Sequence, residues 1–153
     1  MDADRHGRCI PPHKLRPENR TNSVILNANP AEFELIQKIA ESDQDGPVLM
    51  LNQNRYAPAA DYPKGQLYTG YMKALHGLLP TVGGKVLWQI PVLGQPVGEQ
   101  PLHEILAVWY PTHKAFLALR QQVGAAENFR LRALAVEYAV IHRCPADVIP
   151  MPA

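Results

Sequence analysis

The sequence predicts an α+β domain, and three segments in a fixed order carry that prediction. They are PVLMLNQNRY at residues 47–56, GGKVLWQIPVLG at 83–94 and HEILAVWYPTHKAFLAL at 103–119. The first two are typical of apolar strands, and the third of a strand that turns directly into a helix. With helical patterns after the first and third segments, the order is β-α-β-β-α-β. This is the order of the ferredoxin-like fold, in which a four-stranded antiparallel sheet carries both helical connections on one face.

The first half of the chain contains an early helix and then one strand–helix pair. Asn29 and Pro30 suit the cap and the first position of a helix over 30–43. Residues 47–55 form the first strand, whose apolar run lacks alternation, as expected of a central strand covered on both faces. A helix over 65–79 follows an irregular loop, and its apolar stripe consists of Tyr68, Tyr71, Met72, Leu75 and Leu79.

The second half supplies the rest of the sheet. The expected elements are a strand over 85–90, a long hairpin loop over 91–101, a strand over 102–110, helices from Thr112 to about Gln121 and over 125–136, and a strand over 137–144. Gly83 and Gly84 precede a strand rather than a helix, so we assign them to the turn and not to a phosphate loop. We divide the chain into a flexible N-terminal arm and helix (1–45), the ferredoxin-like domain (46–145) and a tail (146–153).

The charge balance and the cysteines exclude several classes of protein. The formal net charge is +1 in 153 residues, and basic residues are not concentrated after position 20, so we expect no nucleic-acid surface. No stretch approaches the roughly 20 apolar residues of a membrane helix, and the N-terminus has no apolar signal core. Cys9 and Cys144 stand far apart without a CxxC. We therefore expect free thiols in the cytoplasm, no membrane contact, no metal and no cofactor.

The strands are apolar on both faces, which predicts a homodimer. By alternation, Val86, Trp88 and Ile90 share one face of the second strand and Leu87 lies on the other. Helices cover only one face of this fold, so the other face would be a large exposed apolar patch, which monomers avoid. Two sheets paired face to face in a dimeric α/β barrel remove that patch. The N-terminal helix would then lie against the partner.

Four pieces of the chain, PVLMLNQNRY, YTGYMKAL, GGKVLW and EILAVWYPTHKAFLAL, resemble family 1330 of the domains of unknown function. The resemblance spans residues 46–144 and implies the dimeric α/β-barrel superfamily. Gln53 and Asn54 depart from an apolar pair that is usual in the family, and Trp109 stands where arginine is common. His103 and Glu104 replace only in part an acidic residue that the family has before the third strand. Because the family has no established general activity, the resemblance implies a fold and an oligomer more than a chemistry.

Relatives of this fold hold small aromatic or ring-containing molecules between the sheet and the helices, which implies two main functions. One is a cofactor-independent oxygenase or isomerase that acts on a small cyclic or aromatic compound. The other is a non-catalytic small-molecule-binding or interaction protein, in which the aromatic residues seal the dimer. A haem-binding role with His103 or His142 on the iron is a third alternative.

Two polar residues are the candidates for catalysis. Asn52 stands in an otherwise apolar central strand, where a buried amide must bond to the backbone or point at a ligand. His103 falls on the Trp109 face by alternation, and it is either a general base or a histidine exposed at the sheet edge.

Four aromatic residues are the candidates for ligand binding. Tyr68 and Tyr71 lie on the helix that borders the cavity, and Trp88 and Trp109 lie in the second and third strands. Packing in the core or at the dimer contact is the alternative for all four. The other histidines receive structural assignments: His142 as a satisfied strand residue, and His76 and His113 as surface residues.

Overall fold

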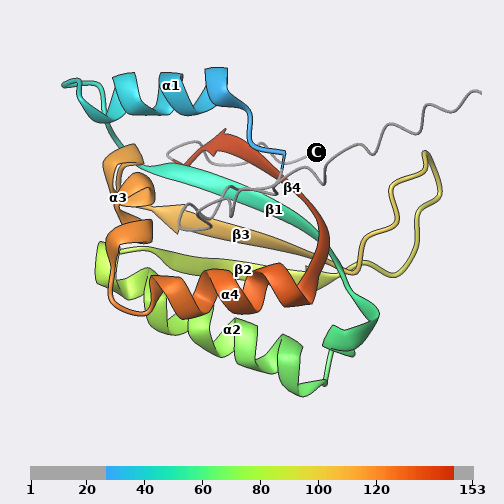
Figure 1. The fold of residues 1–153 in the computed structure, drawn as a ribbon. Coiled ribbons are helices and arrows are strands. Elements are labelled where there is room, and N and C mark those ends of the chain that lie inside the picture. Colours follow the sequence, from blue (N-terminus) through green and yellow to red (C-terminus); the bar gives the residue numbers. More distant parts are fainter. Residues whose placement is uncertain (1–26, 147–153) are drawn as a thin grey trace, which may run out of the picture.

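Four strands form one antiparallel sheet in the computed structural model, which describes residues 27–146 (Figure 1). They are β1 (Val48–Tyr56), β2 (Lys85–Pro91), β3 (Glu104–Tyr110) and β4 (Val136–Pro145). The strand order across the sheet is β2-β3-β1-β4, and every neighbouring pair is antiparallel. The α+β class is confirmed, and each predicted strand is present with its ends shifted by at most two residues.

The helices are α1 (Pro30–Ala40), α2 (Gln66–Leu78), α3 (His113–Ala118) and α4 (Ala125–Ala135). The predicted caps are confirmed at two of them. The Asn29 side chain accepts a hydrogen bond from the Glu32 N–H at 3.4 Å, and the Thr112 hydroxyl accepts one from the Ala115 N–H at 3.0 Å. No helix among the described residues is long and apolar enough to cross a membrane.

The two glycines before β2 form the predicted turn. Gly83 has a φ of +75°, which only glycine adopts without strain. At Gly84, an added Cβ would lie 3.2 Å from the Trp109 carbonyl oxygen and 3.3 Å from that of Leu79. Both positions therefore require glycine, one for its dihedral angle and the other for the close approach of β3.

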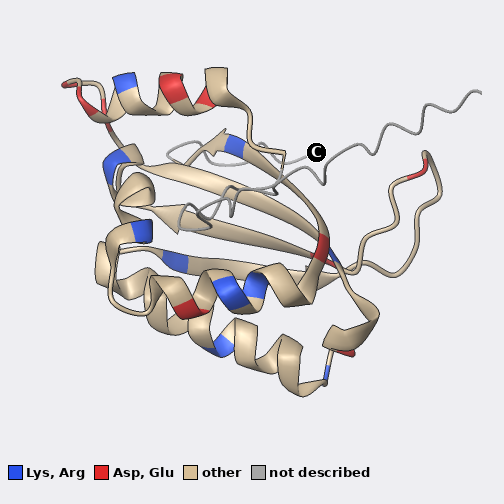
Figure 2. Ribbon diagram, in the orientation of Figure 1, with Lys and Arg blue, Asp and Glu red and all other residues tan. Residues whose placement is uncertain are grey.

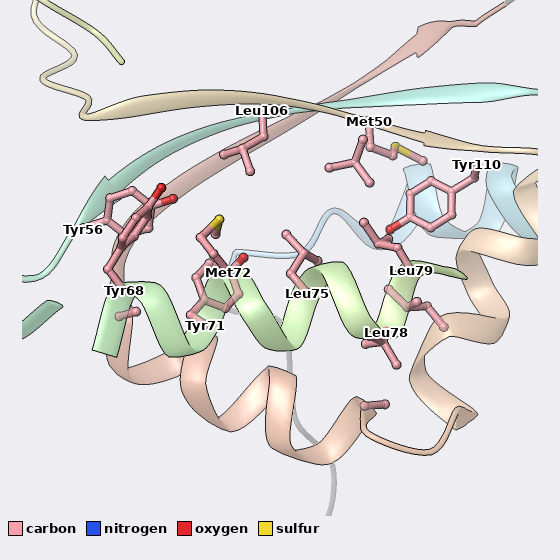
Figure 3. Close-up of a cluster of buried hydrophobic side chains, with 14 of the residues drawn as sticks. Met50, Tyr56, Tyr68, Tyr71, Met72, Leu75, Leu78, Leu79, Leu106 and Tyr110 are labelled. Atoms are coloured by element: carbon pink, nitrogen blue, oxygen red, sulfur yellow. The ribbon is translucent and has the colours of Figure 1, made fainter. Parts of the chain in front are cut away.

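The main core lies between the sheet and the α2–α4 pair, which lie side by side on one face of the sheet (Figures 1 and 3). Tyr71, Met72 and Leu75 of α2 point toward Met50 and Leu106 of the sheet (Figure 3). The core side of β1 and β3 carries their even-numbered residues, because side chains alternate along a strand.

α1 packs against the core and α3 of the same chain. Ile36 is buried in the core, and the ring of Phe33 stacks on that of Phe116 in α3 with centroids 6.2 Å apart. The Arg143 Nε of β4 also donates to a Glu32 carboxylate oxygen at 2.5 Å. The apolar side of α1 thus packs within its own chain, whereas the sequence predicted that it lies against a partner subunit. The predicted arm over 1–23 lies outside the described residues.

The opposite face of the sheet is apolar and is left uncovered by the described residues. Trp88 and Ile90 of β2 are 45% and 49% exposed, beside the half-buried Trp109 of β3. The prediction that Val86 shares this face with Trp88 is wrong. The ladder shifts register between them, so Val86 pairs with Val108 and packs on the core, while Trp88 pairs with Ala107. This β-bulge reverses the alternation for the rest of the strand.

Candidate functional site

A cavity of about 140 Å³ lies between the covered face of the sheet and the helices. Most of its lining is aliphatic or aromatic. The lining residues with polar side chains come from β1, α2, β3, the turn after α3, and α4: Asn52, Asn54, Tyr71, Tyr110, Arg120, Asn128 and Arg132. An apolar cavity with a few convergent polar groups is the usual form of a small-molecule site.

Of the six residues proposed from sequence, two meet in this cavity. Asn52 and Tyr71 both line it, from β1 and α2 respectively. Asn52 also satisfies part of its amide locally, because its Nδ2 donates to the Met50 carbonyl at 3.0 Å. The expected bond to the backbone is therefore present, and a contact between Asn52 and a ligand stays a prediction.

Tyr68, a third proposed residue, belongs to a polar cluster beside the cavity. Its hydroxyl donates to Glu104 at 2.8 Å, and the Tyr56 hydroxyl donates to the other carboxylate oxygen at 2.5 Å. Glu104 is only 3% exposed, and Gln89 lies at 3.4 Å as a further donor. Figure 3 shows Tyr56 and Tyr68 together at one end of the core. The two phenols supply the hydrogen bonds that a buried carboxylate needs.

Burial and the neighbouring carboxylate keep these tyrosines protonated. Burial raises the pKa of Tyr56 above its ordinary value, and the hydrogen bond to Glu104 raises it further. The same two causes raise the pKa of Tyr68. Each hydroxyl therefore remains a donor to Glu104 at physiological pH.

This bonding pattern fixes the amide of Asn54. The Tyr56 proton points to Glu104, so a lone pair of the Tyr56 oxygen is left to accept from the Asn54 Nδ2 at 3.4 Å. The Asn54 Oδ1 then faces away from that contact and has no hydrogen-bond partner among the described residues. Asn54 is 1% exposed and lines the cavity.

Asn128 of α4 also lines this cavity and has a second buried atom without a partner in the described part of the chain. It is 2% exposed, and its Nδ2 has no partner among the described residues. A buried polar group without a partner costs about 1–3 kcal/mol, so native proteins rarely keep two in one place without a reason. The cavity is therefore lined by two buried amides, and each has one atom whose hydrogen-bonding capacity is unused among the described residues.

His103 does not line this cavity. Its Nδ1 accepts from the Tyr56 backbone N–H at 2.9 Å, which leaves the ring proton on Nε2. The ring stacks on Tyr62 and Tyr56 with centroids 5.5 and 6.2 Å away. The prediction that it shares the Trp109 face is wrong, because it precedes β3 and its ring turns back to Tyr56.

The two tryptophans lie on the uncovered face of the sheet, across from the cavity. Trp88 is exposed there, and the Lys85 ammonium lies 5.3 Å from the ring centroid of Trp109. His142 is on the same face with its Nδ1 2.8 Å from the Gln53 Nε2, which confirms it as a satisfied strand histidine. The structure does not bring the tryptophans together with Asn52 and Tyr71.

The surface assignment of His113 is wrong. The side chain is buried, and both its backbone N–H and its Nδ1 bond to one Asp45 oxygen at 2.7 and 2.9 Å. The other Asp45 oxygen accepts from the Lys114 N–H at 3.1 Å. Asp45 thus reaches across from the loop after α1 to bind the first turn of α3. Residues 27–146 contain no group of three or more His, Cys, Asp or Glu placed to hold a metal ion.

The fold has known counterparts. A protein of unknown function from Rhodopseudomonas palustris, RPA0582, has a solved structure with a TM-score of 0.63 and 25% identity, over 77% of this chain and 93% of that one. The structure of methylated RPA0582 gives 0.66 and 25%, over 81% of this chain and 95% of that one. No family model and no curated protein matches the chain. Membership of family 1330 stays a prediction.

Proposed function

We propose that this protein binds a small organic molecule in the cavity between sheet and helices. The observation that carries the proposal is an apolar cavity lined by two buried asparagines, Asn54 and Asn128, each of which has a side-chain atom without a partner among the described residues. A ligand that accepts a hydrogen bond from Asn128 and donates one to Asn54 removes the free-energy cost of both unsatisfied atoms. Its apolar body would displace only weakly held water from the aliphatic walls.

The lining favours binding over the alternative of a cofactor-independent oxygenase or isomerase. Such a reaction needs a general base within hydrogen-bond reach of the substrate. Among the described residues, those that line the cavity include no Asp, Glu or His. Tyr71 is a poor base there, because burial raises its pKa more than the nearby Arg132 guanidinium lowers it.

We propose further that the domain is a ferredoxin-like member of family 1330 and forms a dimeric α/β barrel in the cytoplasm. The strand order β2-β3-β1-β4 supports the first part. The exposed Trp88 and Ile90 on the uncovered sheet face support the second. Trp88→Arg should convert a dimer to a monomer in analytical ultracentrifugation. Leu93→Arg is the matched control, because Leu93 is 97% exposed in the hairpin loop, and a monomeric wild type would refute the dimer.

A cavity-filling variant tests the binding function. Ile141 lines the cavity from β4 and is partly exposed, so Ile141→Trp should fill the space and leave the fold intact. Leu134→Trp on the exposed side of α4 is the control. A panel of neutral, acidic and basic ring compounds is screened by thermal shift. A ligand at 100 times its Kd stabilises the protein by about 2.7 kcal/mol.

The expected result is a set of compounds that stabilise the wild type and Leu134→Trp but not Ile141→Trp. Stabilisation that survives Ile141→Trp, or an empty screen on the wild type, would refute the cavity as a binding site. Mass spectrometry of the bound compounds after incubation in air separates the two functions. Unchanged compounds support binding alone, and an oxidised or isomerised product supports the enzyme.

A further inference from the structure

The cavity holds two arginines that have no acidic partner in the described part of the chain. Five arginines fall within residues 27–146. Arg55, Arg130 and Arg143 each form an ion pair with a glutamate. The remaining two, Arg120 and Arg132, are the ones that line the cavity. Arg132 lies on α4, and Figure 2 shows that this helix carries both basic and acidic residues. Within residues 27–146, Arg132 therefore lacks an acidic partner although a glutamate is present on its own helix.

The Arg120 guanidinium is held in place by aromatic rings. It lies 5.7 Å from the ring centroid of Phe33 and 5.8 Å from that of Phe129. Arg120 itself is exposed, which places it at the mouth of the cavity. Burial of part of the side chain and the like charge of Arg132 both lower its pKa. The two cations line the same cavity, so an anion bound there would be attracted by both of them.

The free donor of Asn128 belongs to the same group. Asn128 and Arg132 are four residues apart on α4, so their side chains project from the same side of the helix. The Asn128 Nδ2 is buried and unpartnered. Arg132 also donates a hydrogen bond to the Tyr71 side chain, and neither guanidinium has an acidic partner among the described residues. Two guanidinium groups and an amide around one cavity are the chemistry that binds a carboxylate.

The size and the walls of the cavity limit what the carboxylate is attached to. An apolar cavity of about 150 Å³ in another protein holds benzene, and this one measures about 140 Å³. Leu75, Leu106 and Val108 are among its walls. A strongly hydrated anion such as inorganic phosphate gains nothing from these walls, whereas a ring or a branched chain does.

We infer that the cavity binds a small carboxylic acid with a cyclic or branched apolar body. Its carboxylate is held by Arg120, Arg132 and the Asn128 amide, and its body lies on the aliphatic walls. The inference rests on the proposed binding function and specifies the ligand class of that same site.

Calorimetric titration of the full-length chain with benzoate, with benzamide and with inorganic phosphate tests the ligand class. Benzamide has the shape of benzoate without its charge. Benzoate should bind at least tenfold more tightly than benzamide, because a hydrogen bond to a charged group is roughly twice as strong as a neutral one. Added salt should weaken benzoate and leave benzamide unchanged. Phosphate binding tighter than that of benzoate would overturn the apolar acid as the ligand.

Arginine variants assign the carboxylate contact. Arg132→Gln and Arg120→Gln should each weaken benzoate about tenfold or more, with little change for benzamide. Arg132→Lys should recover part of the loss. Arg130→Gln is the matched control on the same helix, because Arg130 is exposed and pairs with Glu127. Circular dichroism checks that each variant is folded.

The failures of the two proposals differ. Equal binding of benzoate and benzamide, with Arg132→Gln unaffected, would overturn the carboxylate and leave a cavity that binds neutral molecules. If the benzoate affinity falls equally in Arg130→Gln and Arg132→Gln, the attraction comes from the overall positive charge of the surface, and the specific contact with Arg132 is refuted. An empty thermal-shift screen on the wild type would remove the binding function itself.

Discussion

Replacement of Asn128 by leucine should make the protein more stable and less able to bind its ligand. Asn128 is 2% exposed and lies in the interior of α4. Among the described residues, no side-chain hydrogen bond to it is present, and its Nδ2 is fully buried without a partner. Leucine has nearly the same branched shape and carries no polar atom. The substitution thus removes an unfavourable group without breaking a contact.

The expected gain follows from two contributions. The loss of one buried, unpartnered amide N–H is worth about 1–3 kcal/mol. Leucine is also the better residue in a helix interior, by a few tenths of a kcal/mol. We therefore expect Asn128→Leu to raise the free energy of unfolding by about 1–3 kcal/mol, whereas most core substitutions lower it.

Urea denaturation of the free protein measures this gain, and the benzoate titration measures the loss of binding. Asn52→Leu is the control, because the Asn52 Nδ2 donates to the Met50 carbonyl and its loss should cost about 0.5–1.5 kcal/mol. A loss of stability of 1 kcal/mol or more in Asn128→Leu would refute the reasoning. It would mean that the Asn128 amide is satisfied in the free protein.

Other predictions follow from the contacts around the cavity and the turns. Tyr68→Phe should cost about 1.5–3 kcal/mol in urea denaturation, because it removes a donor to Glu104. Tyr110→Phe should be nearly neutral, because the Tyr110 hydroxyl forms no hydrogen bond with the described residues and is not one of the buried unsatisfied atoms. Burial raises the pKa of Tyr56, Tyr68, Tyr71 and Tyr110, so these groups favour the folded state below the unfolded pKa near 10. Above it, each should lower the free energy of unfolding by about 1.4 kcal/mol per pH unit, and Tyr68→Phe should reduce that slope. Burial raises the pKa of Asp45, but the hydrogen bonds from the His113 and Lys114 N–H groups and from the His113 ring lower it overall. The Asp45 carboxylate therefore stabilises the folded state at neutral pH, and this stabilisation is lost as the pH falls through the lowered pKa. Asp45→Asn should cost about 1.5–3 kcal/mol at pH 7 and flatten the acid limb of the stability curve. Gly83→Ala should cost about 1 kcal/mol or more because its φ is +75°, whereas Gly70→Ala, in open space within α2, should add about 0.5–1 kcal/mol by thermal unfolding.

The elements were predictable because their signals are local. Asn29-Pro30, Thr112 and Gly83-Gly84 act within three or four residues of their own positions, and each behaves in the structure as expected. The apolar runs of β1 and β3 likewise identify central strands without knowledge of their neighbours.

The side of each strand was less predictable, because a bulge is a property of two paired strands. One extra residue between Val86 and Trp88 sends Trp88 to the uncovered face, and simple alternation does not detect it. The same limit applies to His113. Its partner Asp45 lies 68 residues earlier, just after the predicted helix over 30–43, so the pairing cannot be detected from local sequence.

For a related reason, the sequence predicted Asn52 as a site residue but not Asn54. Asn52 stood out as a polar residue in an apolar strand, and alternation puts Asn54 on the same side, two residues later. Asn54 was noted only as a departure from family 1330. What separates the two amides is their partners: Asn52 bonds to Met50 in its own strand, whereas Asn54 is oriented through Tyr56 by Glu104, 50 residues away. A sequence shows which residues are polar, but not which of their atoms are left without a partner.

The cavity combines features that stability alone does not favour. Arg120 and Arg132 place two like charges on one cavity, and Asn54 and Asn128 each bury an atom without a partner among the described residues. Well-packed apolar residues at these positions would make a more stable core. All four residues line one cavity, so a single bound molecule with a carboxylate would offset the two positive charges and accept a hydrogen bond from Asn128. A third buried atom without a partner among the described residues, His113 Nε2, lies outside this cavity, so an unsatisfied atom alone does not mark a site. What favours a binding site is that two buried amides and two arginines without acidic partners in the described part of the chain line the same apolar space.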